Sequence, residues 1–460
     1  MVWFPITPLV SNMTSRSSSP ASSQGSIQCL PLELIREIFL FSTALKLERW
    51  TGDSPLPPRF STTALALSHV CAHWHSIALS FPELWASMAV RCPTEHIVEL
   101  VRLYLERSGE TTLLDLALVD KRYRAGPSGE WPTSSTKWEW ECCSLSILDL
   151  WIPQAHRWVG LDLTLNMSRP STIPQLLEIP PHSLSKLEKV SMGFTYWDVQ
   201  DIQRVWDIVH SSDRLQEVHW PPVLLTPPSL TRFHNITDLF IWSIHLEELA
   251  TLPSLTRLVK FEVMCVKESP MTEMIHLPAL EHLAISSLYV DCIWLFDRIS
   301  TPRLRHFELG LRRELVDLSA FHQFLGRTSC TLERLRLCTY PSISSEEKCL
   351  QFLQLAAPSL VNLRSFTFKF RGMTETTMNV FLPPNDHGQV FLPGLEELSL
   401  LGCHMEDGLI GSMVAARLNV EEGLTTFRVE FIDEEPSHSL DKTTLNNLKD
   451  NRMLKHVYIS

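Results

Sequence analysis

Residues 236–241 read ITDLFI, and the same pattern returns as LVKFEV at 258–263, LEHLAI at 280–285 and LRHFEL at 304–309. In every copy the first, fourth and sixth positions are apolar. The fourth and sixth positions are two residues apart, which is the periodicity of a β-strand, and the first lies on the turn that enters it. Further copies start at Leu187, Leu215, Leu332, Leu363, Leu395, Leu424 and Leu454, and a weaker copy starts at Trp158.

Successive copies lie 21 residues apart at Leu215 and Ile236, and 32 apart at Leu363 and Leu395. Helical spacing of apolar residues between copies, as in 199–209 and 318–325, predicts a helix after several strands. Ser344 and Glu347 have the spacing of a capping box for another. One strand and one helix cannot bury their own apolar faces, but stacked copies share one core. The sequence therefore predicts an α/β solenoid with a curved parallel sheet and helices on its convex side.

The alternative is a doubly wound α/β domain, whose strands are usually continuous apolar runs. The short strands and the recurring three-position pattern favour the solenoid. The repeats resemble leucine-rich repeats, with one departure. The Asn or Cys of that family is replaced by Val266, Leu288, Arg312 and Tyr340, and only Cys403 fits. The resemblance therefore implies an irregular leucine-rich-repeat solenoid of variable pitch.

A different apolar unit precedes the repeats. Residues 30–39 read LPLELIREIF, residues 70–78 read VCAHWHSIA, and residues 82–85 read PELW. Pro31 suits the first turn of a helix, and the following apolar residues form a broad helical face. A loop rich in Pro and Gly, residues 48–60, separates the helices.

These three pieces resemble the F-box motif, in the style of the large F-box families of mushroom-forming fungi. The 48–60 loop is longer than in a minimal F-box, so a different separation of the first two helices is expected in this three-helix module. The resemblance implies docking onto a Skp1-like adaptor and, through it, a cullin and a RING protein. It assigns adaptor contact to Leu30, Pro31, Glu33, Ile35, Ile38, Val70, Cys71, Trp74 and Trp85.

A second interpretation assigns some of these apolar residues to the module's own core. Leu34 and Ile77 are expected in the core, whereas Pro31 and Ile38 are expected at the interface. The same interpretation also places Phe39 and Trp74 in the core. A three-helix unit of this size has too little core for all of its large apolar groups, so an interface for the remainder is expected.

The composition limits the other functions. The net charge of −12 argues against a broad nucleic-acid-binding surface. No apolar run is long enough to cross a bilayer. The eleven cysteines lack a CxxC pair, so reduced thiols in the cytoplasm or nucleus are expected.

No nucleotide-binding, nucleophile-elbow or metalloprotease motif is present. His69, Cys71, His73 and His75 cluster, but without four organised ligands neither a metal nor another cofactor is expected.

Between the fourth and sixth positions of each copy, one side chain is predicted to face the concave side of the sheet. This row mixes charges and chemistry, which suits a protein target. Its candidate target-binding residues are His219, Phe240, Glu262, Glu308, Arg336, Thr367, Arg428 and Tyr458, and the row also contains Ser191, Ala284 and Ser399. A solvated face without a ligand remains the alternative for any single residue.

The predicted organisation is a disordered Ser-rich tail (1–28), an F-box module (29–90), a linker or atypical capping repeats (91–154) and the solenoid (155–460). The expected function is a substrate-recognition adaptor of an SCF-type ubiquitin ligase, not an enzyme, which binds an unknown target protein and neither nucleic acid nor membrane. A non-degradative scaffold that binds the same adaptor is the alternative, and a hydrolase or transferase with an unrecognised site is a third hypothesis.

Overall fold

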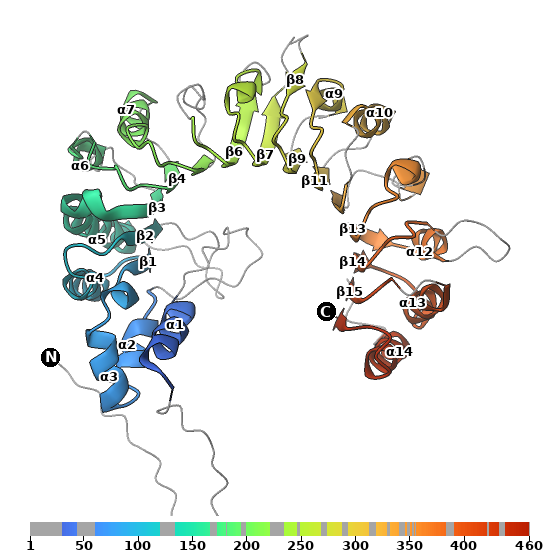
Figure 1. Cartoon of the computed structure of the whole chain (residues 1–460), viewed down its shortest axis with the longest axis horizontal. Coiled ribbons are helices and arrows are strands. Elements are labelled where there is room, and N and C mark those ends of the chain that lie inside the picture. The colour runs from blue at the N-terminus through green and yellow to red at the C-terminus, as the bar shows by residue number, and fades with distance from the viewer. Residues whose placement is uncertain are drawn as a thin grey trace, which may run out of the picture.

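The computed structural model is a horseshoe whose strands line the inner surface and whose helices cover the outer surface (Figure 1). The structure describes residues 30–43, 60–119, 134–165, 173–180, 182–194, 199–220, 234–245, 249–267, 274–287, 293–311, 319–328, 332–339, 346, 350–351, 354, 356–382, 391–420, 423–431 and 438–459. The predicted disordered tail and the capping box at Ser344 and Glu347 lie outside these residues, as does the 48–60 loop except for Phe60.

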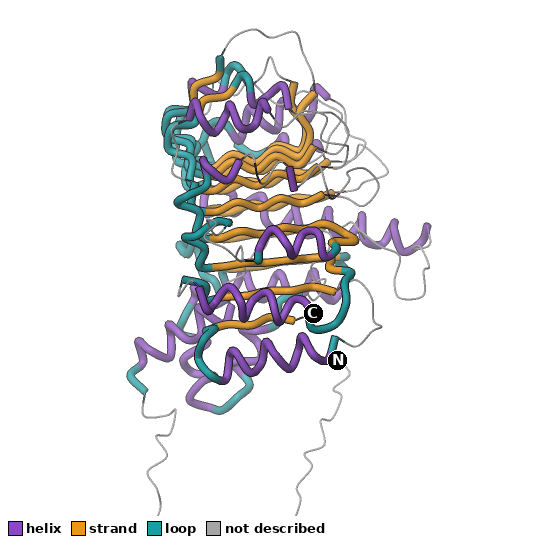
Figure 2. The backbone as a smooth tube through the Cα atoms, turned by 90° about the vertical axis from the view of Figure 1, so that its right-hand side faces the viewer, coloured by secondary structure: helices purple, strands orange, loops and turns teal. Residues whose placement is uncertain are grey.

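One parallel sheet of 14 strands runs the length of the horseshoe, and its strands follow one another in chain order (Figure 2). The predicted curved parallel sheet is therefore confirmed. The strands are β1 (Ser87–Arg91), β2 (Leu114–Val119), β3 (Trp158–Leu165), β4 (Lys189–Phe194), β5 (Glu217–Trp220), β6 (Asp238–His245), β7 (Lys260–Lys267), β9 (His282–Ser287), β11 (His306–Leu311), β12 (Arg334–Thr339), β13 (Ser365–Met373), β14 (Glu397–Cys403), β15 (Thr426–Phe431) and β16 (His456–Ile459). A separate pair, β8 (Ile275–His276) and β10 (Ile299–Ser300), lies outside the main sheet.

The sheet begins earlier than the predicted start of the solenoid at residue 155. Strands β1 and β2 pair with each other, and β2 pairs with β3, so residues 87–119 already belong to the sheet. Helix α4 (Glu95–Arg107) connects β1 to β2, and α5 (Ser134–Trp151) with the 3-10 turn η3 (Ile152–Arg157) precedes β3. The described residues of this range, 91–119 and 134–154, therefore belong to the solenoid, which agrees with the capping-repeat alternative and not with a linker.

Later repeats carry shorter or more variable outer segments. They include α6 (Ile173–Leu177), α7 (Val199–Val209), α9 (Ile293–Phe296), α10 (Ser319–Thr328), α12 (Glu375–Phe381), α13 (Leu409–Val420) and α14 (Ser439–Asp450), with 3-10 turns at η6 (Leu252–Ser254) and η7 (Ala357–Ser359). The helices predicted over 199–209 and 318–325 are α7 and α10. The unequal segments explain the variable repeat length.

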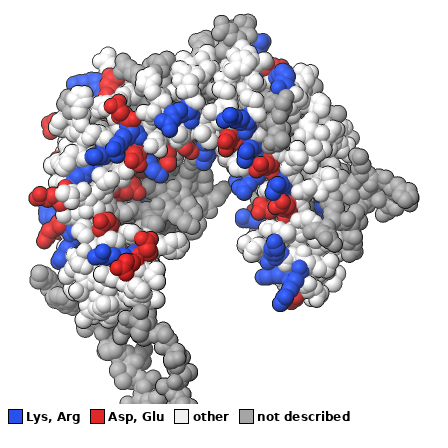
Figure 3. Space-filling view, viewed as in Figure 1, with Lys and Arg blue, Asp and Glu red and all other residues white. Residues whose placement is uncertain are grey.

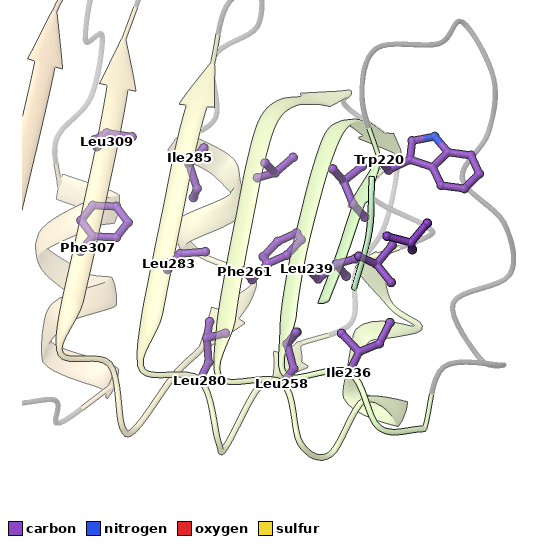
Figure 4. Close-up of a cluster of buried hydrophobic side chains, with 14 of the residues drawn as sticks. Trp220, Ile236, Leu239, Leu258, Phe261, Leu280, Leu283, Ile285, Phe307 and Leu309 are labelled. Carbon is purple, nitrogen blue, oxygen red and sulfur yellow. The ribbon is translucent and has the colours of Figure 1, made fainter. Parts of the chain in front are cut away.

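The three apolar positions of each repeat form three continuous rows in the core (Figure 4). Leu258, Phe261 and Val263 of one repeat are each at most 2% exposed, and they lie beside their counterparts from neighbouring repeats. The leading residue is buried in every copy from Leu187 to Leu454. Burial of these rows drives the stacking, because no single repeat removes enough apolar surface from water on its own.

A ladder of backbone carbonyls joins the turns that enter the strands. The carbonyl of Glu188 accepts the N–H groups of Gln216 and Glu217 at 2.8 and 3.0 Å. Each later repeat continues this pattern, with one carbonyl accepting two N–H groups of the next repeat. The carbonyls are those of Gln216, Thr237, Val259, Glu281, Arg305, Glu333, Arg364, Glu396 and Thr425. Main-chain groups therefore hold this edge of the solenoid together without an Asn or Cys side chain.

Three helices precede the sheet and pack against its first repeat. They are α1 (Leu32–Thr43), α2 (Thr63–Ser68) and α3 (Ala72–Leu79), followed by the 3-10 turn η2 (Pro82–Trp85). We call residues 30–43 and 60–85 the helical module. Phe60 forms an antiparallel bridge with Val90 of β1, and its ring packs edge-on against Tyr104 of α4 at 5.0 Å. The module is thus anchored at one tip of the horseshoe.

Candidate functional site

The first helix of the module buries one face and exposes another. Ile35 and Phe39 are at most 1% exposed and pack into the core, whereas Leu34, Ile38 and Phe41 are 50%, 40% and 82% exposed. These three exposed residues follow helical spacing, so they lie on one side of α1. A folded chain rarely leaves such a row of large apolar side chains in water without a partner for it.

The module holds a disproportionate share of the exposed apolar side chains. Thirteen large apolar residues are exposed in the described part of the chain, and six of them belong to the module. These six are Leu32, Leu34, Ile38, Phe41, Val70 and Leu79. The other seven are spread over residues 113–458. The helical module is therefore the principal candidate for apolar docking.

Two residues assigned to adaptor contact are instead in the core. Ile35 is 1% exposed, and Trp85 is 2% exposed with its indole Nε1 donating to the carbonyl of Ala78 at 2.8 Å. The Trp85 ring also packs edge-on against Tyr104 at 5.1 Å, and burial raises the pKa of Tyr104 to about 12. Trp85 therefore joins the module to the first repeat, and neither residue presents a surface to a partner.

The expectation for Leu34 was also wrong, since it lies outside the core. Ile77 is buried as expected, and Pro31, Glu33, Ile38 and Val70 are exposed. The remaining candidates, Leu30, Cys71 and Trp74, are half-buried.

Cys71 and Trp74 both have structural partners within the module. The Cys71 sulfur accepts the N–H of Trp74 at 3.5 Å at the start of α3. The Trp74 ring packs edge-on against Phe39 at 5.0 Å. Both residues therefore support the module's core while leaving part of their surface accessible.

The predicted concave row forms as a single line across the sheet. Register pairs place Ser191, His219, Phe240, Glu262 and Ala284 side by side, and Glu308, Arg336, Thr367, Ser399, Arg428 and Tyr458 continue the line. The N-terminal extension of this row is Asp162 on β3 and Ala117 on β2. All eight candidate target-binding residues therefore lie on one face.

Charged and polar contacts join several of these residues to neighbours on the same strand or on the adjacent strand. Glu262 contacts Lys260 at 3.2 Å and His282 at 3.8 Å, and Arg336 lies 3.8 Å from Glu308. The edge formed by the entering turns also carries alternating charge, visible along the arc in Figure 3. There Arg305 approaches Glu333 at 3.7 Å. The two exposed pairs, Arg336–Glu308 and Arg305–Glu333, contribute at most about 1 kcal/mol each, so they affect the pattern of surface charge more than the stability.

A group of charged residues near the N-terminal end of the sheet was missed by the sequence analysis. Asp115 lies directly opposite Gly160 on β3, and Asp162 lies two residues further along that strand. Burial raises the pKa of Asp162 to about 6, against the effect of a hydrogen bond from Ser191. Burial also raises the pKa of Asp115, partly offset by Lys189. The Asp162 Oδ1 atom is buried without a hydrogen-bond partner.

One group of side chains in the described residues has the geometry to hold a metal ion. The ligand atoms of Asp407, His438 and Asp441 lie within 4.8 Å of one another. Their hydrogen bonds identify a structural role. Asp407 accepts the N–H groups of Leu440 and Asp441 at 3.0 Å, and Asp441 accepts the N–H of Gly411 at 2.7 Å. The two carboxylates therefore cap α14 and α13 reciprocally.

The cluster of His69, Cys71, His73 and His75 does not converge in this way. The three histidines are exposed, and the His75 Nδ1 lies 2.9 Å from the carbonyl of Ser68. No disulfide joins the described cysteines. Of the described helices, none is long and apolar enough to cross a membrane.

Comparisons with known proteins identify no family. No family model matches the sequence, and no curated protein matches it. Among solved structures, the chain is similar to an internalin from Listeria monocytogenes, with 13% sequence identity, 60% of this chain and 81% of that chain covered, and a TM-score of 0.27.

Proposed function

We propose that this chain is the substrate-recognition subunit of an SCF-type ubiquitin ligase, in which the helical module is an F-box and the solenoid is an irregular leucine-rich-repeat array. The exposed apolar row on α1, Leu34, Ile38 and Phe41, is the observation that carries the proposal. It lies in the segment whose sequence resembles the F-box motif. Apolar anchors of this kind form the centres of protein interfaces.

In this proposal the chain works by proximity. The module holds a Skp1-like adaptor linked to a cullin and a RING protein in the cytoplasm or nucleus, and the concave face holds a target protein. Tethering raises the effective concentration of the target near the ubiquitin donor. No residue of this chain then performs covalent chemistry, and no cofactor is required.

The direct test measures capture of a recombinant Skp1-type adaptor by the full chain. Ile38→Glu with Phe41→Glu should abolish capture, because two charges would be buried against the partner. Leu440→Glu is the matched control, since Leu440 is a 60% exposed apolar residue on α14 at the opposite end of the chain. Retained capture by the double variant, with unchanged circular dichroism, would refute F-box docking.

A second measurement separates the ligase from a non-degradative scaffold. Affinity purification with mass spectrometry should recover the adaptor and cullin only with the intact module, whereas targets persist with the double variant. A ligase subunit predicts that at least one of these targets accumulates when the chain is deleted or the proteasome is inhibited. Adaptor binding without any such accumulation would identify the scaffold.

A further inference from the structure

The concave face contains three zones of different chemistry. Near its N-terminal end is an acidic zone of Asp115, Asp162, Glu217 and Asp238. Its middle is an aromatic zone of His219, Phe240, Trp242 and Met264, all half-buried. Toward the C-terminal end is an arginine zone of Arg334, Arg336 and Arg428, all exposed.

The acidic zone has more carboxylates than the two lysines in its row, Lys189 and Lys260, and Lys260 also contacts Glu262 at 3.2 Å. Lys189 contacts Glu217 at 2.9 Å and also attracts Asp115 and Asp238, which raises the Lys189 pKa. Asp162 receives no such cation, and its Oδ1 atom remains buried without a hydrogen bond. An unpaired buried carboxylate oxygen is costly, and a ligand ammonium or guanidinium group would remove that cost.

The arginine zone presents exposed guanidinium groups, whereas the acidic zone presents carboxylates. Arg428 makes no ion pair with the described residues, and Arg336 lies 3.8 Å from Glu308, with side chains 51% and 41% exposed. Thr367 and Ser399 lie between the two arginines on the intervening strands, and offer hydroxyl groups to an anion. Glu308 lies directly opposite Arg336, Glu397 lies in the row of Arg334 two strands away, and Glu430 is two residues further along β15 from Arg428. Forked guanidinium groups suit carboxylates and phosphates.

The aromatic zone lies between Asp162 and the arginine zone, and its His219 and Phe240 share strands β5 and β6 with Glu217 and Asp238. The His219 and Phe240 rings pack at 5.8 Å, and Trp242 and Met264 occupy the next row on β6 and β7. Half-exposed aromatic and Met side chains are favoured at the centre of a protein interface.

The strand spacing sets the length of a ligand that reaches both charged zones. Asp162 on β3 and Arg336 on β12 are separated by seven strand-to-strand steps. At about 4.8 Å per step this is about 34 Å. An extended peptide covers about 3.4 Å per residue, so about ten residues span the two zones.

We propose that the concave face binds an extended protein segment with basic residues at one end, an apolar or aromatic middle, and acidic residues at the other end about ten residues away. The inference rests on the proposed target-binding role of this face and specifies the chemistry of the target. It does not depend on the helical module.

The test uses the full chain and labelled peptides in a fluorescence-anisotropy titration. The reference peptide carries Arg-Lys-Arg, ten neutral residues including Leu and Phe, and Glu-Glu-Glu. Comparison peptides have a four-residue spacer, only the basic end, or only the acidic end. The reference peptide should bind at least tenfold more tightly than each comparison peptide. Equal binding of the four-residue and ten-residue peptides would overturn the proposal.

Variants then assign each end of the peptide. Arg336→Glu with Arg428→Glu should weaken the reference peptide at least tenfold, and so should Asp115→Asn with Asp162→Asn. Arg303→Glu is the matched control, because Arg303 is exposed on the turn before β11 and lies outside the concave rows. The arginine double variant should also prefer a peptide whose Glu-Glu-Glu is replaced by Lys-Lys-Lys. Absence of both the loss and this switched preference would refute the assignment of the arginine zone.

The adaptor-docking proposal and the peptide-binding proposal can each be refuted without refuting the other. Ile38→Glu with Phe41→Glu should leave peptide binding unchanged even where adaptor capture is lost. Adaptor capture without peptide discrimination would refute only the zoned face, and peptide discrimination without adaptor capture would refute only the F-box assignment.

Discussion

The carboxylate of Asp115 lies in the space that a side chain at Gly160 would fill. A Cβ built on Gly160 would be 2.2 Å from Asp115 Oδ1 and 3.1 Å from its Cγ. The absence of a side chain on one strand thus permits a carboxylate on the next strand. This pairing determines where the first acidic group of the concave face is held.

Gly160→Ala should therefore displace the Asp115 side chain and lower the free energy of unfolding by about 1 kcal/mol, a modest cost of overpacking. The cost should largely disappear in the double variant with Asp115→Ala, because the clashing carboxylate is then gone. Urea unfolding of the wild type, both single variants and the double variant measures this coupling. Additive effects would show that Gly160 is required for another reason.

Asp162→Asn should change stability in a pH-dependent way. The folded-state pKa of Asp162 is about 6, above the ordinary value of 3.8, so ionisation destabilises the folded chain. Its favourable contribution is complete below pH about 4 and is lost as the pH rises through about 6. The variant should match the wild type at pH 4 and exceed it by on the order of 2 kcal/mol at pH 7.5. A pH-independent difference in urea unfolding would contradict this.

The reciprocal caps should make Asp407 and Asp441 interdependent. Asp441→Ala leaves the Gly411 N–H without its 2.7 Å acceptor and removes the contact with His438, so a loss of about 1–3 kcal/mol is expected. Hydrogen exchange should quicken first in α13 and α14. Asp450→Ala, an exposed change at the other end of α14, is the control and should have almost no effect.

Substitutions of Trp85 and Phe41 should distinguish the residues that stabilise the module from those that bind the adaptor. Trp85→Ala should lower the free energy of unfolding by about 3–5 kcal/mol, because it opens a cavity between the module and the first repeat. Phe41→Ala should leave stability nearly unchanged, since its side chain is 82% exposed, while weakening adaptor capture. Thermal unfolding and adaptor capture on the same preparations measure both properties. A stable Trp85→Ala chain would contradict the burial of this junction.

The sequence predicts the sheet of the later repeats residue by residue. Side chains alternate between the two faces of a strand, so burial of Phe261 and Val263 places Glu262 on the opposite face. A shift of the strand register by one residue would expose the core side chains. The same reasoning correctly aligned His219 with Arg428 and Tyr458 in one row. Strand β2 was missed although Leu113, Leu116 and Leu118 carry the same spacing. In the folded chain Leu113 is exposed and Leu114 is buried. The pairing of β2 with β3 shifts by one residue between Leu114 and Asp115, so Leu114 and not Leu113 lies opposite Trp158.

The helical module was harder to predict because α1 is apolar on two sides. Leu34 and Ile35 are adjacent in sequence, about 100° apart around a helix, and equally apolar. Which of them is buried depends on where Phe39, Trp74 and the first repeat lie, and no local pattern encodes that. The burial of the Asp162 carboxyl group is likewise a tertiary property, because it depends on the side chains of neighbouring strands that pack around it.

The carbonyl ladder affects how the number of repeats can change during evolution. Each repeat is attached to the next at the Glu188–Thr425 edge by main-chain groups that every residue except proline supplies in full. Duplication or deletion of a whole repeat therefore needs no matching change of side chains at that seam. New lengths of outer segment, and new residues in the concave row, can be acquired one repeat at a time while the seam stays intact.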